Sequence, residues 1–303
     1  MSAAVVVYTC DVGGVDWLHR PQMQTPGARF VRFSDRPAFR QSPWEHRPLP
    51  TLTAGLSPRL KSRFPKILPH RVLPDAEVSI WIDGSVMVLA DLTPLVEEFR
   101  QSGAALALFR HPTGRSVNAE IDAVLAGGFL KGTDHADALR DRYGRAGHLD
   151  TPVSENTILF RRAGAPGLDA AMEDWWHEVT TQCQRDQISL PSVLDAHGVS
   201  VHYWGWHFDE AGSPWFRRIP HRHADPVRRT LTGIHFLSEY RLDYRLLRVP
   251  VRAVGAARRW LSRGSMHRRV IGSPEQVAPA PETHAAAPPV GASSNGPTET
   301  SGA

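Results

Sequence analysis

The sequence is poor in cysteine and lysine and has no long apolar segment. Its 303 residues include two cysteines, Cys10 and Cys183, without a metal-type spacing, which argues against a disulfide framework and suits a reducing cytosol. No apolar run approaches the roughly 18 residues that span a bilayer. Because residues 1–9 also lack the basic start of a signal peptide, we expect a cytoplasmic protein.

Several well-known motifs are missing as well. The patterns GxxxxGK[ST], GxGxxG and GxSxG do not occur, so P-loop, kinase-type and serine-hydrolase functions lose their usual support. The composition, 41% hydrophobic and 22% charged, is that of an ordinary globular protein. The sequence therefore predicts a folded domain whose chemistry must come from other residues.

Charge is distributed unevenly along the chain. Residues 1–240 hold 26 basic and 27 acidic side chains, whereas residues 241–272 hold nine arginines against Asp243 alone. The main body is therefore not a general polyanion binder, and we expect no nucleic-acid partner.

The C-terminal part has two compositions. Residues 248–270 predict a basic amphipathic helix that either docks on an anionic membrane surface or packs its apolar face on the main domain. Membrane docking would place the protein at the cytoplasmic face of a membrane. Residues 273–303 are rich in alanine, proline, glycine and serine, which predicts a disordered tail.

Short apolar runs alternate with helical patterns in the main body. We expect strands at residues 3–9, 29–33, 78–82, 104–109, 156–160 and 199–204, and helices near residues 91–103, 117–127, 134–145, 167–183 and 187–197. Residues 36–58 are rich in proline and polar residues and predict a long irregular connection. This alternation predicts an α/β domain over residues 1–240, with a mostly parallel sheet flanked by helices, followed by an extension (241–272) and a tail (273–303).

The clearest strand, residues 78–82, ends in Asp83-Gly84-Ser85. In open α/β sheets, ligands bind beyond the carboxyl ends of the strands. Carboxylate and hydroxyl oxygens there are suitable ligands for Mg²⁺ or Mn²⁺. The alternative is that Asp83-Gly84 is only a turn after a strand.

Two further groups of polar residues carry candidate chemistry. Lys61 and Lys66 are two of only three lysines, and with Arg59 and Arg63 they could contact a diphosphate, or form a solvated helix face. Asp186 and Gln187 could act at a reacting carbon, or cap a helix. Glu155 and His111 lie near predicted strand ends, where polar residues either take part in chemistry or hydrogen-bond a loop; the first could be a base.

Histidines are frequent toward the C-terminus, which suggests a metal-dependent hydrolase as an alternative function. No pair has the HExxH spacing of a metalloprotease. One of His197, His202, His207, His221, His223 and His235 could complete a metal site begun by Asp83.

Taken in order, these segments resemble a glycosyltransferase-like family of bacterial proteins and plant mucilage-related proteins. The resemblance covers roughly residues 4–205, and its most specific parts are PKILPHRVLP, SIWIDGS and RDQISL. It implies a GT-A-like, Rossmann-like fold and transfer of a sugar from a nucleotide-diphospho-sugar donor to a hydroxyl of a glycan or lipid-linked acceptor. A catalytically silent module that binds nucleotide sugars is another reading, and the sequence leaves sugar, base, acceptor and stereochemistry open.

The resemblance also implies roles for individual residues. Donor binding falls to Tyr8, Thr9 and Asp35 at the nucleoside, and to Lys61, Arg63, Lys66, His111 and Arg185. Catalysis falls to Asp186, Gln187 and Glu155. A more distant similarity to glycogenin-type transferases matches their DxD metal motif to Asp83 and Ser85, so one charged ligand of Mn²⁺ or Mg²⁺ is replaced by a hydroxyl. The candidates for the third, histidine ligand of those transferases are His221, His223 and His235.

Overall fold

The computed structural model describes residues 4–219, apart from 17–18, 37–42, 131 and 209–212, and scattered positions between 227 and 234. The predicted basic helix at 248–270 and the predicted tail lie outside the described residues. The same holds for the three candidate metal ligands of the C-terminal region, His221, His223 and His235.

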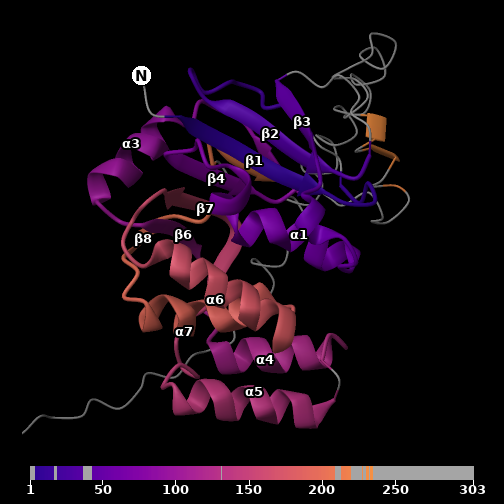
Figure 1. Cartoon of the computed structure of the whole chain (residues 1–303), viewed down its shortest axis with the longest axis vertical. Helices are drawn as coiled ribbons and strands as arrows, with labels where there is room; N and C mark the ends of the chain where they lie inside the picture. Colours follow the sequence, from indigo (N-terminus) through magenta and orange to yellow (C-terminus); the bar gives the residue numbers. More distant parts are fainter. Residues whose placement is uncertain are drawn as a thin grey trace, which may run out of the picture. The chain divides into compact units, whose positions relative to one another are not determined.

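A seven-stranded sheet forms the centre of the domain, in the order β3-β2-β1-β4-β7-β6-β8 (Figure 1). All neighbouring strands are parallel except at β7, which runs antiparallel to β4 and to β6. The strands are β1 (Val5–Asp11), β2 (Arg29–Ser34), β3 (Trp44–Pro48), β4 (Val78–Ile82), β6 (Leu106–Arg110), β7 (Ser154–Arg162) and β8 (Val201–Trp204). The predicted mostly parallel α/β sheet is therefore confirmed.

The central strands are buried on both faces. All five residues of β4 and six of the seven residues of β1 are buried. A strand covered on both sides reads as a continuous apolar run instead of an alternating one, which is why the sequence identified these two strands clearly.

The prediction of an irregular connection over residues 36–58 is wrong in one part, because β3 lies within it. This strand is at the edge of the sheet, pairs only with β2, and leaves most of its side chains exposed. Its polar sequence therefore carries no apolar pattern that would reveal a strand. A second small sheet, β5 (Val86–Val88) with β9 (Phe216–Arg218), is also absent from the sequence prediction because its strands have only three residues each.

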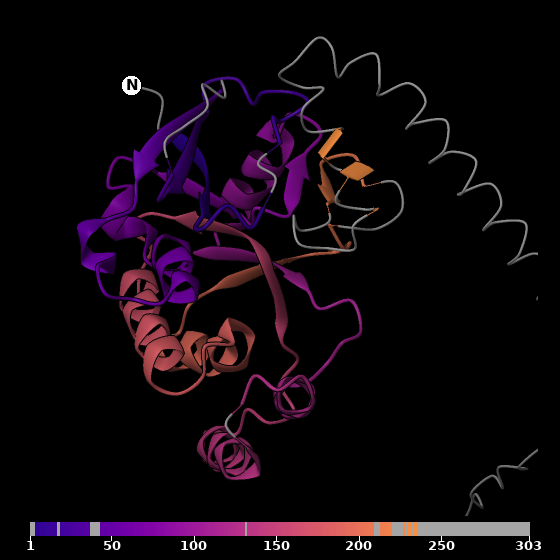
Figure 2. The same ribbon diagram turned by 90° about the vertical axis from the view of Figure 1, so that its right-hand side faces the viewer.

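Helices cover the two faces of the sheet. On one face α3 (Thr93–Ser102) packs against β4 and its neighbours. On the other face lie α1 (Pro58–Ile67), α6 (Leu168–Thr181) and α7 (Asp186–Ala196), which share a core with β1 (Figure 2). The sheet is thus the middle layer of three.

The remaining helices are a smaller addition. The pair α4 (Val117–Ala126) and α5 (Thr133–Arg145) has an apolar core of its own, which α7 joins through Ile188. Two short turns of helix, η1 (Thr51–Thr53) and α2 (Pro69–Val72), flank α1. Within the described residues no helix has the length and apolar character needed to cross a membrane.

Three segments far apart in the sequence meet beyond the carboxyl ends of β1 and β4, which we call this edge of the sheet. Asp83 directly follows β4, and the antiparallel β7 starts beside it with residues 154–156 because β7 runs in the opposite direction. Helix α7 begins at Asp186, close to the start of β7. Helix α1 closes this edge on the side of β1, so the topology gathers residues that the sequence separates by more than 100 positions.

Candidate active site

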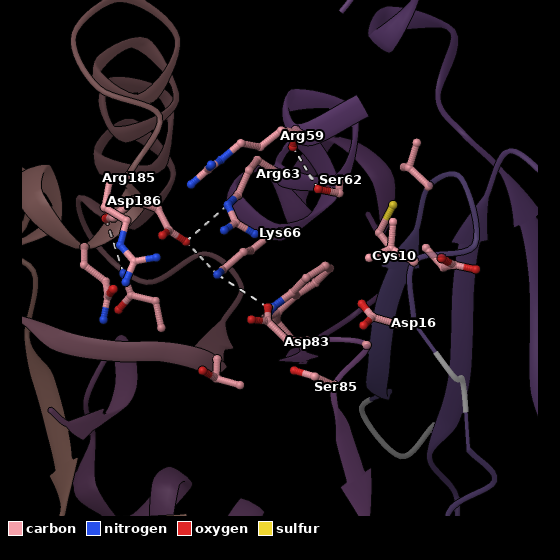
Figure 3. Close-up of a pocket in the computed structure, with 18 of the residues that line it drawn as sticks. Cys10, Asp16, Arg59, Ser62, Arg63, Lys66, Asp83, Ser85, Arg185 and Asp186 are labelled. Atoms are coloured by element: carbon pink, nitrogen blue, oxygen red, sulfur yellow. Dashed lines mark hydrogen bonds and ion pairs between the residues drawn. The ribbon is translucent and has the colours of Figure 1, made fainter. Parts of the chain in front are cut away.

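A cavity of about 530 Å³ opens at this edge of the sheet (Figure 3). Its walls come from the carboxyl ends of β1 and β4, one face of α1, the start of β7 and the start of α7. This is the position at which open α/β sheets bind ligands. The side chains in the walls are mostly charged.

The Lys66 ammonium lies between two carboxylates. Its Nζ is 2.6 Å from Asp186 Oδ2 and 3.5 Å from Asp83 Oδ1, and the side chain is almost fully buried. Arg63 adds a second cation, with its Nε 3.5 Å from the same Asp186 oxygen. The strand end of β4 and the start of α7 are thus joined through one helix, α1.

Asp186 is fixed through its main chain as well as its side chain. Its carbonyl oxygen accepts hydrogen bonds from Trp175 Nε1 (2.9 Å) and from Asn156 Nδ2 (3.3 Å). Burial by itself would raise the pKa of this carboxyl group, but Arg63 and Lys66 hold it well below the usual range of an aspartate. Asp186 is therefore a buried, rigidly held anion at neutral pH.

Asp83 is held in a different way. Trp81 Nε1 donates a hydrogen bond of 2.7 Å to Asp83 Oδ1, and the Trp81 ring packs edge to face with Tyr8 at 5.3 Å between centroids. The backbone N–H of Asp83 donates to the carbonyl of Thr157 on β7. The Asp83 side chain is 28% exposed, whereas that of Asp186 is 4% exposed, although both line the cavity.

One face of α1 is cationic. Arg59, Arg63 and Lys66 follow helical spacing and all line the cavity. Burial, with Arg63 as the next cause, lowers the pKa of Arg59, as expected for a cation beside other cations. Across the cavity, Arg185 is oriented by an ion pair of 2.8 Å with the fully buried Glu120.

The remaining predicted residues are locked by local hydrogen bonds. Gln187 Nε2 donates to the carbonyl of Ser154 (2.8 Å), and Thr157 Oγ1 donates to Glu155. Arg218, from β9, comes within 3.7 Å of Glu155. Burial lowers the pKa of His111, with Arg115 acting in the same direction, so this imidazole is neutral at pH 7.

The structure brings most of the predicted site residues to the cavity. They are Arg63, Lys66, Asp83, Ser85, His111, Glu155, Arg185, Asp186 and Gln187. Four others do not line it. Tyr8 and Thr9 are buried in β1, Asp35 accepts a hydrogen bond from the backbone of Gly13 (3.0 Å), and Lys61 lies off the cationic face of α1.

Several lining residues were not among those predicted. Ser62 precedes Lys66 by four positions, a spacing that places both on one helical face and could have identified it. The same spacing would have separated Lys61 from the site. Asp16 and Arg218 also line the cavity, but they come from a loop and a three-residue strand that carry no sequence signal.

Oxygen atoms around Gly84 are suitable in type for a hard divalent cation. Asp83 and Ser85 flank this glycine, and the Asp16 carboxylate lies so close that a Cβ on Gly84 would be 2.6 Å from its Oδ2. The described residues contain no cluster of three or more histidine, cysteine, aspartate or glutamate side chains placed to hold a metal. Protein groups would therefore supply part of a coordination shell, with diphosphate and water oxygens as the rest.

Part of the chain is similar to known glycosyltransferase-like proteins. Residues 56–204 match the model of the TOD1/MUCI70 glycosyltransferase-like domain, which confirms the resemblance read from the sequence. A probable hexosyltransferase, MUCI70 of Arabidopsis thaliana, is 29% identical over 147 residues, which cover 45% of this chain. The matched stretch spans only 25% of that plant protein.

Two solved glycosyltransferase structures are similar to this chain. Mouse xyloside xylosyltransferase 1 in its apo form has 12% identity and a TM-score of 0.38, over 66% of this chain and 84% of that one. The apo WbbM bifunctional glycosyltransferase has 12% identity and a TM-score of 0.45, over 67% of this chain and 39% of that one. At these values nothing about the site is transferred from them.

Proposed function

We propose that the domain transfers a sugar from a nucleotide-diphospho-sugar donor to a hydroxyl group of a glycan acceptor. One observation carries this proposal beside the domain match: the cationic face of α1, Asp83 and the start of α7 all line one cavity. A cavity of about 530 Å³ is within the range of about 300–1,000 Å³ typical of small-molecule sites.

The cations would neutralise the diphosphate of the donor. Arg59 of α1 and Arg185, the residue before α7, both line the cavity, and guanidinium groups form paired hydrogen bonds with phosphate oxygens. Negative charge grows on the diphosphate as the bond to the sugar breaks, so fixed cations stabilise the transition state more than the ground state. The same positive groups would favour donor binding.

A divalent ion would add to this effect. Asp83 and Ser85, with Asp16 nearby, are the residues that would hold Mg²⁺ or Mn²⁺. When bound, such an ion supplies a Lewis acid at the leaving diphosphate. The protein's own contribution is the orientation of Asp83 by Trp81 and Lys66.

Asp186 and Gln187 would act beside the anomeric carbon. The ionised Asp186 carboxylate stabilises positive charge that develops on the sugar, as carboxylates do at oxocarbenium-like centres. Lys66 and the buried hydrogen bonds of its main chain keep that carboxylate in place. A histidine-based hydrolase has less support, because among the described residues His111 is the one histidine that lines the cavity.

The direct test is binding and turnover with a panel of nucleotide sugars. Calorimetric titration with uridine- and guanosine-diphosphate sugars, with and without Mn²⁺, identifies the donor, and release of nucleoside diphosphate in the presence of glycan acceptors measures transfer. Turnover supports the transferase. Binding without turnover would instead make the domain a silent nucleotide-sugar module, and absence of binding would remove the proposal.

Asp83→Asn is the sharpest variant for this test. An amide oxygen can still accept the hydrogen bond from Trp81, so the fold is preserved while the charge is lost. We expect kcat/KM to fall about 10²–10³-fold, comparable to removing one group that stabilises transition-state charge. The matched control is Asp122→Asn on α4, whose side chain is 60% exposed and remote from the cavity. Equal activity of both variants would exclude Asp83 from the mechanism.

A further inference from the structure

A second cavity, of about 270 Å³, lies on the α6 side of the sheet toward the amino end of β4. Ser79 of β4 and Arg161 of β7 line it, and they are directly paired across the two strands. The first turn of α6 and the loop before it form the opposite wall. Because Ser79 precedes Asp83 by four residues, the two cavities lie toward opposite ends of the same strand.

Arg161 is a buried cation without a matching anion. Its side chain is 2% exposed, and its Nη1 donates one hydrogen bond of 3.1 Å to the hydroxyl of Tyr8. Nε and Nη2 have no hydrogen-bond partner, and no carboxylate pairs with this guanidinium in the described part of the chain. Since unpaired buried charges are strongly unfavourable, a partner for these two nitrogens is expected.

The start of α6 adds positive potential to the same cavity. Leu168 and Asp169, the first two residues of this 14-residue helix, line the cavity. No side chain caps the helix, because the preceding residue is Gly167 in a left-handed conformation (φ 72°). The N–H of Leu168 donates to the carbonyl of Ala165 (3.2 Å), so the N–H groups of the next two residues, with the helix dipole, are those that attract an anion.

The two carboxylates at the rim differ in their surroundings. Glu173 receives two hydrogen bonds from Arg71 (2.6 and 2.7 Å) and lies 2.8 Å from His70 Nε2. The other ring nitrogen of His70 lies 3.7 Å from Asp169, which is 55% exposed. Glu173 is thus paired with Arg71 and Asp169 is open to water, so the buried charge of the cavity is the positive one of Arg161.

We propose that this cavity binds a small oxyanion, a carboxylate or phosphate group, at Arg161 with the first turn of α6. Nε and Nη2 of Arg161 hold the anion, and the N–H groups at the start of α6 contribute from the other wall. The volume is just below the range of about 300–1,000 Å³ for drug-sized ligands, so the ligand is an anion with a small attached group or none. The site is separate from the donor cavity and does not depend on sugar transfer.

The test measures thermal stability of the full chain with inorganic phosphate, glycerol phosphate and succinate, against sodium chloride of equal ionic strength. A ligand that binds only the folded state raises Tm with concentration. We expect a saturable rise with at least one of these anions and a half-saturating concentration at least tenfold higher in Arg161→Met. Comparing the three anions shows whether the site prefers free phosphate, an organic phosphate or a carboxylate.

Two controls separate this site from the donor cavity. Arg59→Gln removes a cation from the donor cavity, so it should leave the anion effect unchanged, and Arg161→Met should leave binding of uridine diphosphate unchanged. Soaking crystals of the wild-type protein in selenate gives a readout that does not depend on any variant folding, with an anomalous peak expected beside Arg161. The proposal is overturned if no anion raises Tm, if the rise is lost in Arg59→Gln instead, or if selenate density is absent from this cavity.

Discussion

The two ends of strand β4 each lie near a buried cation, but the two cations differ in whether anions surround them. Beyond its carboxyl end, the Lys66 ammonium contacts both Asp83 and Asp186. Toward its amino end, the guanidinium of Arg161 has a phenol hydroxyl as its one hydrogen-bond partner in the described structure. Both cations are almost fully buried, and only the first is surrounded by anions.

The surroundings of Lys66 form a preorganised site, whereas those of Arg161 form an incomplete one. Charges that compensate each other before substrate arrives hold their geometry without a ligand, as electrostatic catalysis requires. A buried charge without a counter-charge instead favours whatever anion can reach it. The same strand therefore supports a site whose charges are balanced within the protein, and another whose balance depends on a bound molecule.

The largest loss of stability is expected from removing Lys66, the cation between Asp83 and Asp186 beyond the carboxyl end of β4. We call this end of the strand the balanced end. Lys66→Met leaves Asp186, which is 3% exposed, with Arg63 as its main remaining cation. Removing one partner of a buried ion pair destabilises proteins by about 3–5 kcal/mol, and we expect the lower end because Arg63 stays. Urea denaturation at pH 7 measures the free energy of unfolding.

Lys61→Met is the matched control, since Lys61 lies on the same helix but outside the cavity. It should change stability by less than about 0.5 kcal/mol, as is usual for residues without buried partners. Similar losses in both variants would mean that the pairing of Lys66 with the two carboxylates contributes little.

A smaller change in the free energy of unfolding is expected from protonating Asp186 at the balanced end. The pKa of Asp186 is lowered in the folded protein, so this residue adds stability that is present above the ordinary aspartate pKa of about 3.9. That contribution is lost as the pH falls below this value toward the lowered pKa. In Asp186→Asn, the slope of unfolding free energy between about pH 4 and pH 2 should fall by up to about 1.4 kcal/mol per pH unit, the value for one proton.

Asp75→Asn serves as the comparison for this titration, because Asp75 is exposed. Its removal should leave the acid slope nearly unchanged. If both variants lose stability in acid as steeply as the wild type, the low pKa of Asp186 is not a source of folding stability.

The sequence predicts the balanced end well and the other end not at all. Asp83 follows an apolar strand, and the RDQ segment and the lysines of α1 are local patterns, so each could be identified without knowledge of the fold. Bringing them together needs the antiparallel β7, whose direction no local pattern encodes. Arg161 is the last but one residue of an ordinary strand sequence, and neither its burial nor its lack of a counter-charge can be predicted from its neighbours.

Lys61 and Tyr8 illustrate the same limit. Lysine scarcity placed Lys61 with Lys66, but helical geometry points only one of them into the cavity. The resemblance implies a nucleoside contact for Tyr8, whereas its buried hydroxyl accepts a hydrogen bond from Arg161. Side-chain direction and partner identity depend on tertiary packing, which sequence spacing records only in part.

The smallest change in the free energy of unfolding is expected from replacing Arg161, the cation without a counter-charge. Arg161→Met exchanges an unpaired buried charge for an apolar side chain of similar length, so the loss of packing is small and a desolvation cost disappears. The Tyr8 hydroxyl keeps its hydrogen bond with Ser79. In buffer without phosphate or carboxylate, we expect the free energy of unfolding to stay within about 1 kcal/mol of the wild type, the size of one ordinary hydrogen bond. A loss as large as that of Lys66→Met would show that Arg161 is already compensated inside the protein, and the contrast between the two ends of β4 would then disappear.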